Sequence, residues 1–154
     1  MQQYIGTKLV TSTPMNRADY NTYRGWTLPE NEDGSDDGYL VEYQDGGKPN
    51  DSRHAGYISW SPKAQHDAAY RPCDAMTFGL AVEALKKGMR VSRAGWNGKG
   101  MWLEYVPTNG VDLAYIRMSY PVTGLQSGPY HNGARVPWLA SQTDVLAEDW
   151  QIVS

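Results

Sequence analysis

The chain has 154 residues and a formal net charge of −3 at neutral pH, with 40% hydrophobic and 20% charged residues. This length suits one medium domain or two small ones, and the composition is sufficient for a modest hydrophobic core. Because the chain is acidic and has no lysine- or arginine-rich run, we do not expect it to bind a nucleic-acid polymer through charge alone.

The first ten residues show a strand pattern and no secretory signal. Residues 4–10, YIGTKLV, are predicted to form a short strand. A charged segment followed by an apolar one, as in a signal peptide, is not found there, and no apolar run approaches the roughly 20 residues of a membrane span. We therefore expect a cytoplasmic protein that has no membrane partner.

The next segments predict a helix followed by an acidic loop. Asn16 is placed to cap a helix over RADYNTY, which Gly25 ends. The loop GWTLPENEDGSDDG follows, but its carboxylates lack the spacing and the terminal glutamate of a calcium loop. We interpret this loop as solvated.

Two strands and a second helix complete the first half of the chain. Residues 38–44 alternate between apolar and polar side chains, and residues 56–60 are the predicted returning strand of a hairpin. Ser61 before Pro62 predicts the cap and first position of a helix over KAQHDAAY. These elements define an N-terminal α+β module of residues 1–71.

The second half contains the clearest helix, TFGLAVEALKKG, which begins at Thr77 and ends at Gly88. Its apolar residues Phe78, Ala81, Val82 and Leu85 follow the i, i+3, i+4, i+7 spacing of a buried helical face. A loop is predicted over residues 120–132 and a capped helical turn over SQTDVLAEDW. Strands are predicted over MRVSRA, MWLEYVP, residues 111–118, ARVPWLA and residues 150–153. We expect a C-terminal helix-plus-antiparallel-sheet domain of residues 76–154, and an α+β class with small antiparallel sheets and short helices overall.

The sequence provides no catalytic set. His54, His66 and His131 lie in a loop, a polar helix and a loop, without a spacing that positions a second group, and we interpret them as surface histidines. Cys73 is the single cysteine, so no intrachain disulfide forms, and no cysteine–histidine cluster suggests a metal site. We therefore predict a protein that is not an enzyme and uses no cofactor or metal.

The segment GWNGKGMW, between two predicted strands, carries the groups of a ligand site. Its glycines allow close backbone approach, Trp96 offers a flat face and Asn97 offers an amide. An aromatic face that stacks on a base, next to an amide that hydrogen-bonds to the edge of that base, can bind a nucleobase. The structural alternative is a type I′ turn at Asn97-Gly98, with Trp96 covering the sheet. The sequence leaves both readings open.

A second segment, PWLASQTD, repeats this combination of tryptophan and polar residues. Trp138 precedes four consecutive polar residues, Ser141, Gln142, Thr143 and Asp144. The alternative is a helix cap by Ser141 or Thr143, a role that is compatible with ligand binding. The guanidinium forks of Arg90 and Arg93 suit a pyrophosphate, with surface salt bridges as the alternative.

Two long motifs in this order resemble the second family of Thoeris anti-defence proteins, phage proteins formerly classed as a domain of unknown function. They are MTFGLAVEALKKGMRVSRAGWNGKGMWLEYVP, residues 76–107, and VPWLASQTDVLAEDWQIV, residues 136–153. The resemblance covers about the C-terminal half. Residues 1–71 look like a module fused ahead of such domains in phage proteins, to which no activity is assigned.

The resemblance implies a protein that sequesters a signal. Family members take up a cyclic ADP-ribose isomer made by bacterial TIR-domain enzymes without cleaving it, and some bind cyclic dinucleotides at separate sites. It also implies a homotetramer with pockets at subunit interfaces, in the cytoplasm of the infected bacterium. The pocket residues implied for this sequence are Arg93, Trp96, Asn97, Met101, Tyr105, Trp138, Ser141, Gln142, Thr143 and Asp144. A phage structural or host-interaction module, which binds protein or glycan through exposed tryptophans, is the alternative of a different class.

Overall fold

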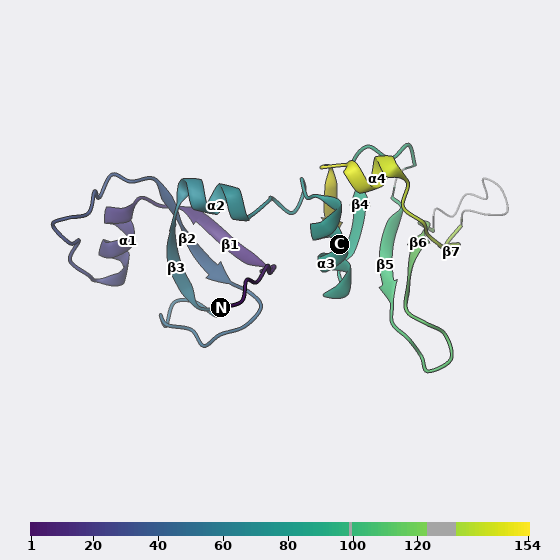
Figure 1. Cartoon of the computed structure of the whole chain (residues 1–154), viewed down its shortest axis with the longest axis horizontal. Helices are drawn as coiled ribbons and strands as arrows, with labels where there is room; N and C mark the ends of the chain where they lie inside the picture. The colour runs from purple at the N-terminus through teal and green to yellow at the C-terminus, as the bar shows by residue number, and fades with distance from the viewer. Residues whose placement is uncertain (99, 123–131) are drawn as a thin grey trace. The chain divides into compact units, whose positions relative to one another are not determined.

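The computed structural model describes residues 1–98, 100–122 and 132–154, and these form two compact units, Met1–Tyr70 and Arg71–Ser154 (Figure 1). Each unit contains one antiparallel sheet and short helices. The α+β class predicted from the sequence is confirmed. His131, Lys99 of the GWNGKG segment and most of the loop predicted over residues 120–132 lie outside the described residues.

The N-terminal unit has the predicted order of strand, helix, two strands and helix. Its elements are β1 (Val10–Pro14), α1 (Arg17–Arg24), β2 (Gly38–Tyr43), β3 (Ile58–Pro62) and α2 (Lys63–Ala69). The sheet order is β1-β2-β3 with both pairs antiparallel, so the predicted hairpin is confirmed. Tyr20 of α1 packs on Leu40 and Ile58 of the sheet to form the core of this unit.

The first strand lies later in the chain than predicted. Residues 4–10 were expected to form it, but β1 begins at Val10, which pairs with Tyr43 at the end of β2. Pairing continues to the start of α1, because the Met15 N–H donates to Gly38 O at 2.9 Å. The six residues of β2 therefore pair with residues 10–15. Tyr4 and Ile5, which the sequence pattern placed in the strand, lie before the paired segment.

One local prediction in this unit is also wrong. Ser61 does not cap α2, because Ser61 and Pro62 belong to β3 and α2 begins without a side-chain cap. The acidic loop has exposed carboxylates, as interpreted, and it is joined to α1 because Gly34 O accepts from the N–H of Ala18 at 2.9 Å. The caps of α1 are as predicted: Asn16 Oδ1 accepts from Asp19 N at 2.7 Å, and Gly25 has a φ of 70°.

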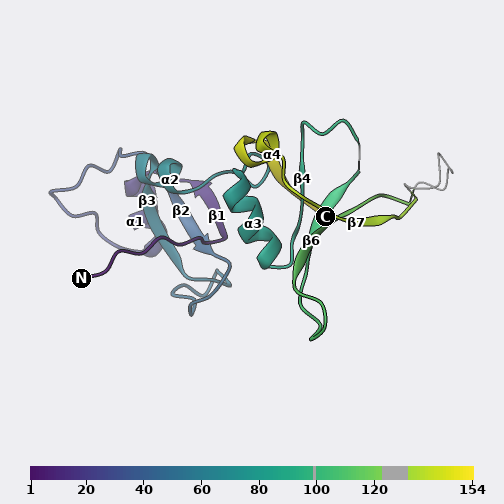
Figure 2. The ribbon, with the colours of Figure 1, turned by 45° about the vertical axis from the view of Figure 1, so that its right-hand side comes forward.

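The C-terminal unit places one long helix on a five-stranded sheet. Its elements are α3 (Phe78–Lys86), β4 (Arg90–Arg93), β5 (Trp102–Val106), β6 (Tyr115–Ser119), β7 (Arg135–Pro137), α4 (Gln142–Leu146) and β8 (Trp150–Val153). The order β7-β6-β5-β4-β8 is antiparallel throughout. In Figures 1 and 2, α3 runs alongside β4, and α4 lies near the end of β4.

Two strands of this unit are much shorter than predicted. Of the strand expected over ARVPWLA, only Arg135–Pro137 forms β7. The strand expected over residues 111–118 begins only at Tyr115. Thr108 Oγ1 donates to Asp112 O at 2.7 Å, and Asn109 Oδ1 accepts from the N–H of Asp112 at 2.8 Å. These local bonds close a turn over residues 108–112, so the backbone there follows the turn instead of the sheet.

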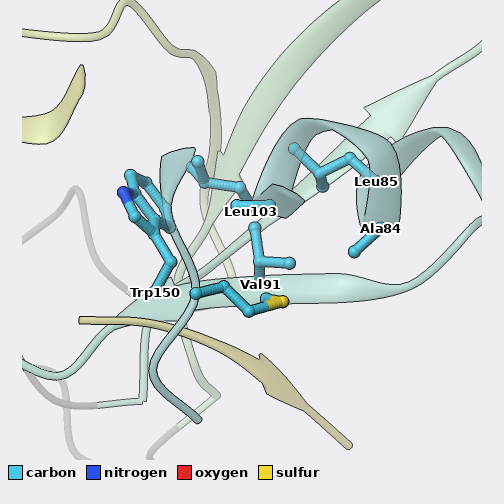
Figure 3. Packing of buried hydrophobic residues seen from close by; sticks show 7 residues of the cluster. Ala84, Leu85, Val91, Leu103 and Trp150 are labelled. Carbon is cyan, nitrogen blue, oxygen red and sulfur yellow. The ribbon is translucent and has the colours of Figure 1, made fainter. Parts of the chain in front are cut away.

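The core of this unit lies between α3 and the sheet. Buried residues of the helix, Ala81, Ala84 and Leu85, pack with Val91 of β4, Leu103 of β5 and Trp150 of β8 (Figure 3). Thr77 caps α3 through its side chain, and Gly88 has a φ of 84° after the helix, as predicted. Ala84 takes the buried position predicted for Val82, which is only half-buried.

We expect Leu103→Ala to destabilise the C-terminal unit by about 2–5 kcal/mol, because Leu103 is 0% exposed and its removal leaves a cavity. The free energy of unfolding is measured by urea titration, followed through tryptophan fluorescence. Leu113→Ala is the matched control, since Leu113 is 86% exposed and its truncation should change stability by less than about 0.5 kcal/mol. Equal losses in both variants would contradict the assigned core.

Candidate functional site

The carboxylate of Asp144, only 8% exposed, connects three segments of the C-terminal unit. Its Oδ1 accepts from Arg93 Nη1 at 2.9 Å and from the indole Nε1 of Trp96 at 3.2 Å. Its Oδ2 accepts from the backbone N–H and the hydroxyl of Ser141 at 3.0 and 2.7 Å. Both oxygens are therefore committed to the protein, and Asp144 is a positioning residue for the site.

Asp144 and Ser141 also form the start of α4. The Ser141 hydroxyl accepts from the N–H of Asp144 at 3.1 Å, which completes a capping box. This is the cap that the sequence offered as an alternative for PWLASQTD. The Asp144 carbonyl accepts from Trp150 Nε1 at 2.9 Å, so α4 is also fixed to β8.

A second carboxylate, that of Asp149, fixes the backbone at the start of the GWNGKGMW segment. Asp149 Oδ1 accepts from Arg93 Nε at 2.8 Å, and Oδ2 accepts from the N–H of Gly95 at 2.7 Å. A Cβ at Gly95 would lie 2.7 Å from Oδ2, so a larger residue would displace the Asp149 carboxylate. The two residues are 54 positions apart, and spacing along the chain does not reveal their contact.

Arg93 is therefore flanked by two carboxylates, the salt-bridge alternative raised for it. The hydrogen bond that Arg93 donates to Asp149, followed by the one it donates to Asp144, raises the pKa of the Arg93 guanidinium. The same bond from Arg93 is the main reason that the pKa of Asp149 is lowered. Arg90 lies elsewhere, with its guanidinium 5.0 Å from the ring centroid of Trp102.

Burial alone would raise the pKa of Asp144, but the hydrogen bonds from Ser141, Arg93 and Trp96 outweigh it and lower that pKa to about 2. The carboxylate is therefore ionised at neutral pH. A permanently ionised, fully bonded carboxylate holds structure and is not a proton donor.

The two predicted tryptophans lie together in an aromatic cluster. The ring centroids of Trp96 and Trp138 are 6.3 Å apart, and Trp150 lies 5.5 and 5.9 Å from them. Phe78 of α3 joins the cluster, with its ring 6.2 Å from that of Trp138. Trp96 and Trp138 are half-buried against the core, whereas Trp150 is fully buried. Each of the first two therefore retains part of its surface for contact.

The structural alternative for this segment is half right: Trp96 packs against the core of the unit, but the turn at Asn97-Gly98 is not of type I′. That turn needs a positive φ at both central residues, and no described non-glycine residue, Asn97 included, has one. The side chain of Met101 fills the space that a Cβ at Gly98 would need, so methionine packing shapes this segment. The positive φ falls instead at Gly100, at 75°.

The remaining predicted site residues differ in where they lie. Exposed polar side chains flank the aromatic cluster in sequence: Asn97, Ser141, Gln142 and Thr143. Met101 is half-buried against Gly98. Tyr105 lies further along β5, opposite Ile116 of β6, and is 41% exposed. The structure thus brings Arg93, Trp96, Trp138, Ser141 and Asp144 together.

The sheet face opposite the core carries a second polar group that the sequence did not reveal. Glu104 Oε1 accepts from Ser119 Oγ at 2.6 Å and from Arg117 Nε at 2.9 Å. The bond from Ser119 is the main reason that the pKa of Glu104 is lowered. On the same face, Trp102 Nε1 is buried and has no hydrogen-bond partner in the described chain.

Two histidines are not the isolated surface residues that the sequence suggested. His54 Nδ1 lies 2.7 Å from Glu42 Oε2, and its Nε2 lies 2.8 Å from the Tyr23 hydroxyl. His66 Nε2 lies 2.7 Å from Ser12 Oγ, and its ring stacks on Tyr39 at 4.0 Å. Both side chains are less than one-sixth exposed. The partners come from distant segments, which spacing along the chain does not show.

Neither metal ligands nor membrane-crossing helices are found where the structure describes the chain. Residues 1–98, 100–122 and 132–154 contain no group of three or more His, Cys, Asp or Glu side chains suited to a metal ion. Within the same ranges, every helix is too short or too polar to traverse a lipid bilayer.

Comparison with known proteins matches the C-terminal unit. The family model described as Tad2-like, the Thoeris anti-defense 2-like domain, matches residues 76–153. Thoeris anti-defense 2 of Bacillus phage SP01 is 43% identical over 88 residues, which is 51% of this chain and 96% of that protein. The family match includes Arg93, Trp96, Trp138 and Asp144, and residues 1–75 lie outside it.

We expect Asp144→Asn to destabilise the C-terminal unit by about 3 kcal/mol, because it leaves the largely buried Arg93 without one of its two counter-charges. Urea titration measures the loss. Asp74→Asn makes the same chemical change at an exposed position and should be neutral within about 0.5 kcal/mol. An Asp144→Asn variant as stable as Asp74→Asn would rule out the positioning role.

The free energy of unfolding of the C-terminal unit should also decrease at acid pH. The pKa of Asp144 is about 2 in the folded chain against 3.8 for an unperturbed aspartate, so its contribution to stability is fully present above the unfolded value and is lost as the pH falls toward 2. The difference corresponds to about 2 kcal/mol. Urea midpoints between pH 2.5 and 5 should therefore fall more steeply for the native chain than for Asp144→Asn, and parallel profiles would refute this assignment.

Proposed function

This chain belongs to the Thoeris anti-defense 2-like family, and from that premise we propose that it binds and sequesters cyclic nucleotide immune signals without cleaving them. A cyclic ADP-ribose isomer made by bacterial TIR-domain enzymes is the proposed principal ligand, and cyclic dinucleotides are a second class. The protein would act in the cytoplasm of the infected bacterium. Sequestration is stoichiometric, so the effector of the defence system stays inactive as long as the signal is bound.

The observation that carries this proposal is the pair of half-buried tryptophans, Trp96 and Trp138, beside exposed amide and hydroxyl side chains. Each ring is held from behind by Trp150, and Trp138 also contacts Phe78. A ring that is fixed before binding loses little entropy on binding, and stacking on one base contributes about 1–3 kcal/mol. Asn97 and Gln142 supply donors and acceptors for base edges.

The pairing of Arg93 argues for a supporting role in this site. Two of its five N–H donors are used by Asp144 and Asp149. The remaining donors could reach a phosphate group, but only against the field of the two carboxylates. We therefore assign the main recognition to ring faces and neutral polar groups, with Arg93 chiefly holding Asp144 in place.

Binding without cleavage is supported by the state of the nearby carboxylates. A general acid for cleavage of a glycosidic or phosphate bond needs a raised pKa. The pKa of Asp144 and that of Asp149 are both lowered, and both side chains are bonded to Arg93. Neither is therefore suited to donate a proton to a leaving group, and we propose that the ligand is released chemically unchanged.

We further propose that the unit assembles as a homotetramer in which neighbouring copies complete the ligand pocket. Two apolar side chains of the PWLASQTDVL segment are strongly exposed, Leu139 at 91% and Leu146 at 76%. Apolar groups next to a binding segment commonly mark a subunit interface. A pocket enclosed from two sides would also help to reach the nanomolar affinity, roughly 12 kcal/mol, that competition with an effector requires.

The direct test is the release of ligand from loaded protein. The protein is incubated with lysate that contains the TIR product, washed, heated, and the supernatant is analysed by mass spectrometry. Recovery of the intact cyclic ADP-ribose isomer supports sequestration. An altered nucleotide would indicate an enzyme, and an empty supernatant would favour the host-interaction alternative.

We expect Asn97→Ala to weaken binding of the cyclic ADP-ribose isomer by about ten- to a hundredfold, because a base edge would lose its amide partner. Isothermal titration calorimetry measures the dissociation constant. Asn97 is exposed, so the variant should keep the stability of the native chain. Asn31→Ala, at an exposed position of the N-terminal unit, is the matched control, and equal affinities of the two variants would remove Asn97 from the site.

A further inference from the structure

A groove of about 400 Å³ lies in the N-terminal unit, between α1 with the loop that follows it and the edge strand β3 (Figure 1). We call it the α1–β3 groove. Four aromatic rings line it, those of Tyr20, Trp26, Tyr57 and Trp60. The groove lies outside the family match and shares no residue with the proposed nucleotide site. Its volume is in the range of small-molecule binding sites.

Two of these rings are exposed although they line a concave surface. Trp26 is 54% exposed and Tyr57 is 45% exposed. Trp26 is nevertheless held in place, because the Arg24 guanidinium lies 4.4 Å from its ring centroid and Tyr20 packs edge-on at 6.1 Å. A flat side chain that is fixed before binding loses little entropy when a ligand covers it. The groove therefore offers a preorganised aromatic surface.

The cations of the groove already have carboxylate partners. Arg17 lies 3.1 Å from Glu32 and 3.1 Å from Asp36, and Arg24 lies 3.9 Å from Asp51. The N-terminal unit as a whole contains ten Asp and Glu against six Lys and Arg, a net charge of −4. A ligand that carries a phosphate or carboxylate group is therefore not favoured.

A cationic ligand is not favoured either, because guanidinium groups already lie over two of the rings. Arg17 is 4.4 Å from the ring centroid of Trp60, as Arg24 is from that of Trp26. An aromatic site for a ligand cation relies on the attraction of the ring faces for positive charge, and here that attraction is already used. The charges thus select a neutral ligand.

The backbone beside the groove does not suit an extended peptide. The side-chain amide of Asn50 binds both the N–H and the C=O of Ile58, each at 2.8 Å, at the edge of β3. The strand ends at Pro62, which has no N–H. Strand addition depends on main-chain hydrogen bonds along a free edge. The ligand is therefore one that binds through side chains.

Acceptor oxygens lie among the side chains of the groove. Asn21 uses its Nδ2 to donate to Arg17 O at 2.9 Å, and Glu32 uses its Oε2 to accept from Arg17. Within residues 1–98, 100–122 and 132–154, no hydrogen bond occupies Asn21 Oδ1, Glu32 Oε1 or the Tyr57 hydroxyl. All three residues line the groove. They match a ligand that has several O–H donors, and an aliphatic ligand would leave them unpaired.

We propose that the α1–β3 groove binds a neutral carbohydrate, with pyranose rings against Trp26 and Tyr57 and sugar hydroxyls donating to Asn21 and Glu32. A pyranose combines the properties that the groove selects. It has no charge, the C–H groups of one ring face are attracted to the electron-rich face of an aromatic ring, and its rim carries hydroxyl groups. This site is independent of nucleotide binding by the C-terminal unit.

A glycan array probed with the full chain tests this proposal. The array carries neutral oligosaccharides of glucose, galactose, mannose and N-acetylglucosamine, with sialic-acid and uronic-acid oligosaccharides for comparison. The chain should bind neutral oligosaccharides and not the acidic ones. This binding should be lost in Trp26→Ala and retained in Tyr115→Ala, which removes an aromatic side chain of similar exposure, 40%, from the other unit.

Saturation-transfer NMR with the neutral oligosaccharide that gives the strongest array signal provides the second measurement. The ring C–H protons should receive the largest saturation, and Trp26→Ala and Tyr57→Ala should each weaken binding at least about tenfold. Urea titration confirms that both variants are folded.

Three outcomes would overturn the proposal: no neutral oligosaccharide binds, acidic oligosaccharides bind equally well, or a folded Trp26→Ala variant binds like the native chain. Binding of the cyclic ADP-ribose isomer should be unchanged in Trp26→Ala, so the carbohydrate site and the nucleotide site can fail separately.

Discussion

The carboxylate of Asp144 is the constraint on which the rest of the C-terminal site depends. It bonds to Arg93 at the end of β4, to Trp96 in the following turn and to Ser141 at the start of α4, across sequence separations of 51, 48 and 3 residues. A largely buried carboxylate is costly when any of its partners is missing. The three segments therefore form together, and the position of Trp96 follows from this one group.

The same bonds limit what the site can use for recognition. Because Trp96 donates its indole N–H to Asp144, this N–H is not available to the proposed ligand. The face of Trp138 is likewise set by the rings behind it. Polar discrimination is left to exposed side chains such as Asn97 and Gln142. Fixed aromatic rings with exposed polar groups at the rim would suit a binder that must release its ligand slowly.

Features that depend on neighbours three or four residues away could be predicted from the sequence. Examples are the cap of α1 at Asn16, that of α3 at Thr77 and the capping box at Ser141. Features that depend on distant partners could not. The bond of Asp149 to Gly95 and the pairing of His54 with Glu42 became visible only when the segments were brought together. The start of β1 belongs to the same class, because the length of β2 decides it.

Net charge differs between the two units. Residues 1–70 carry a net charge of −4, whereas residues 71–154, with eight Lys and Arg against seven Asp and Glu, carry +1. The net charge of the second unit therefore opposes an anionic ligand less than that of the first. This difference favours the C-terminal unit as the place of the proposed nucleotide site, because the main recognition proposed there uses ring faces and neutral polar groups and needs only that phosphate groups are not repelled.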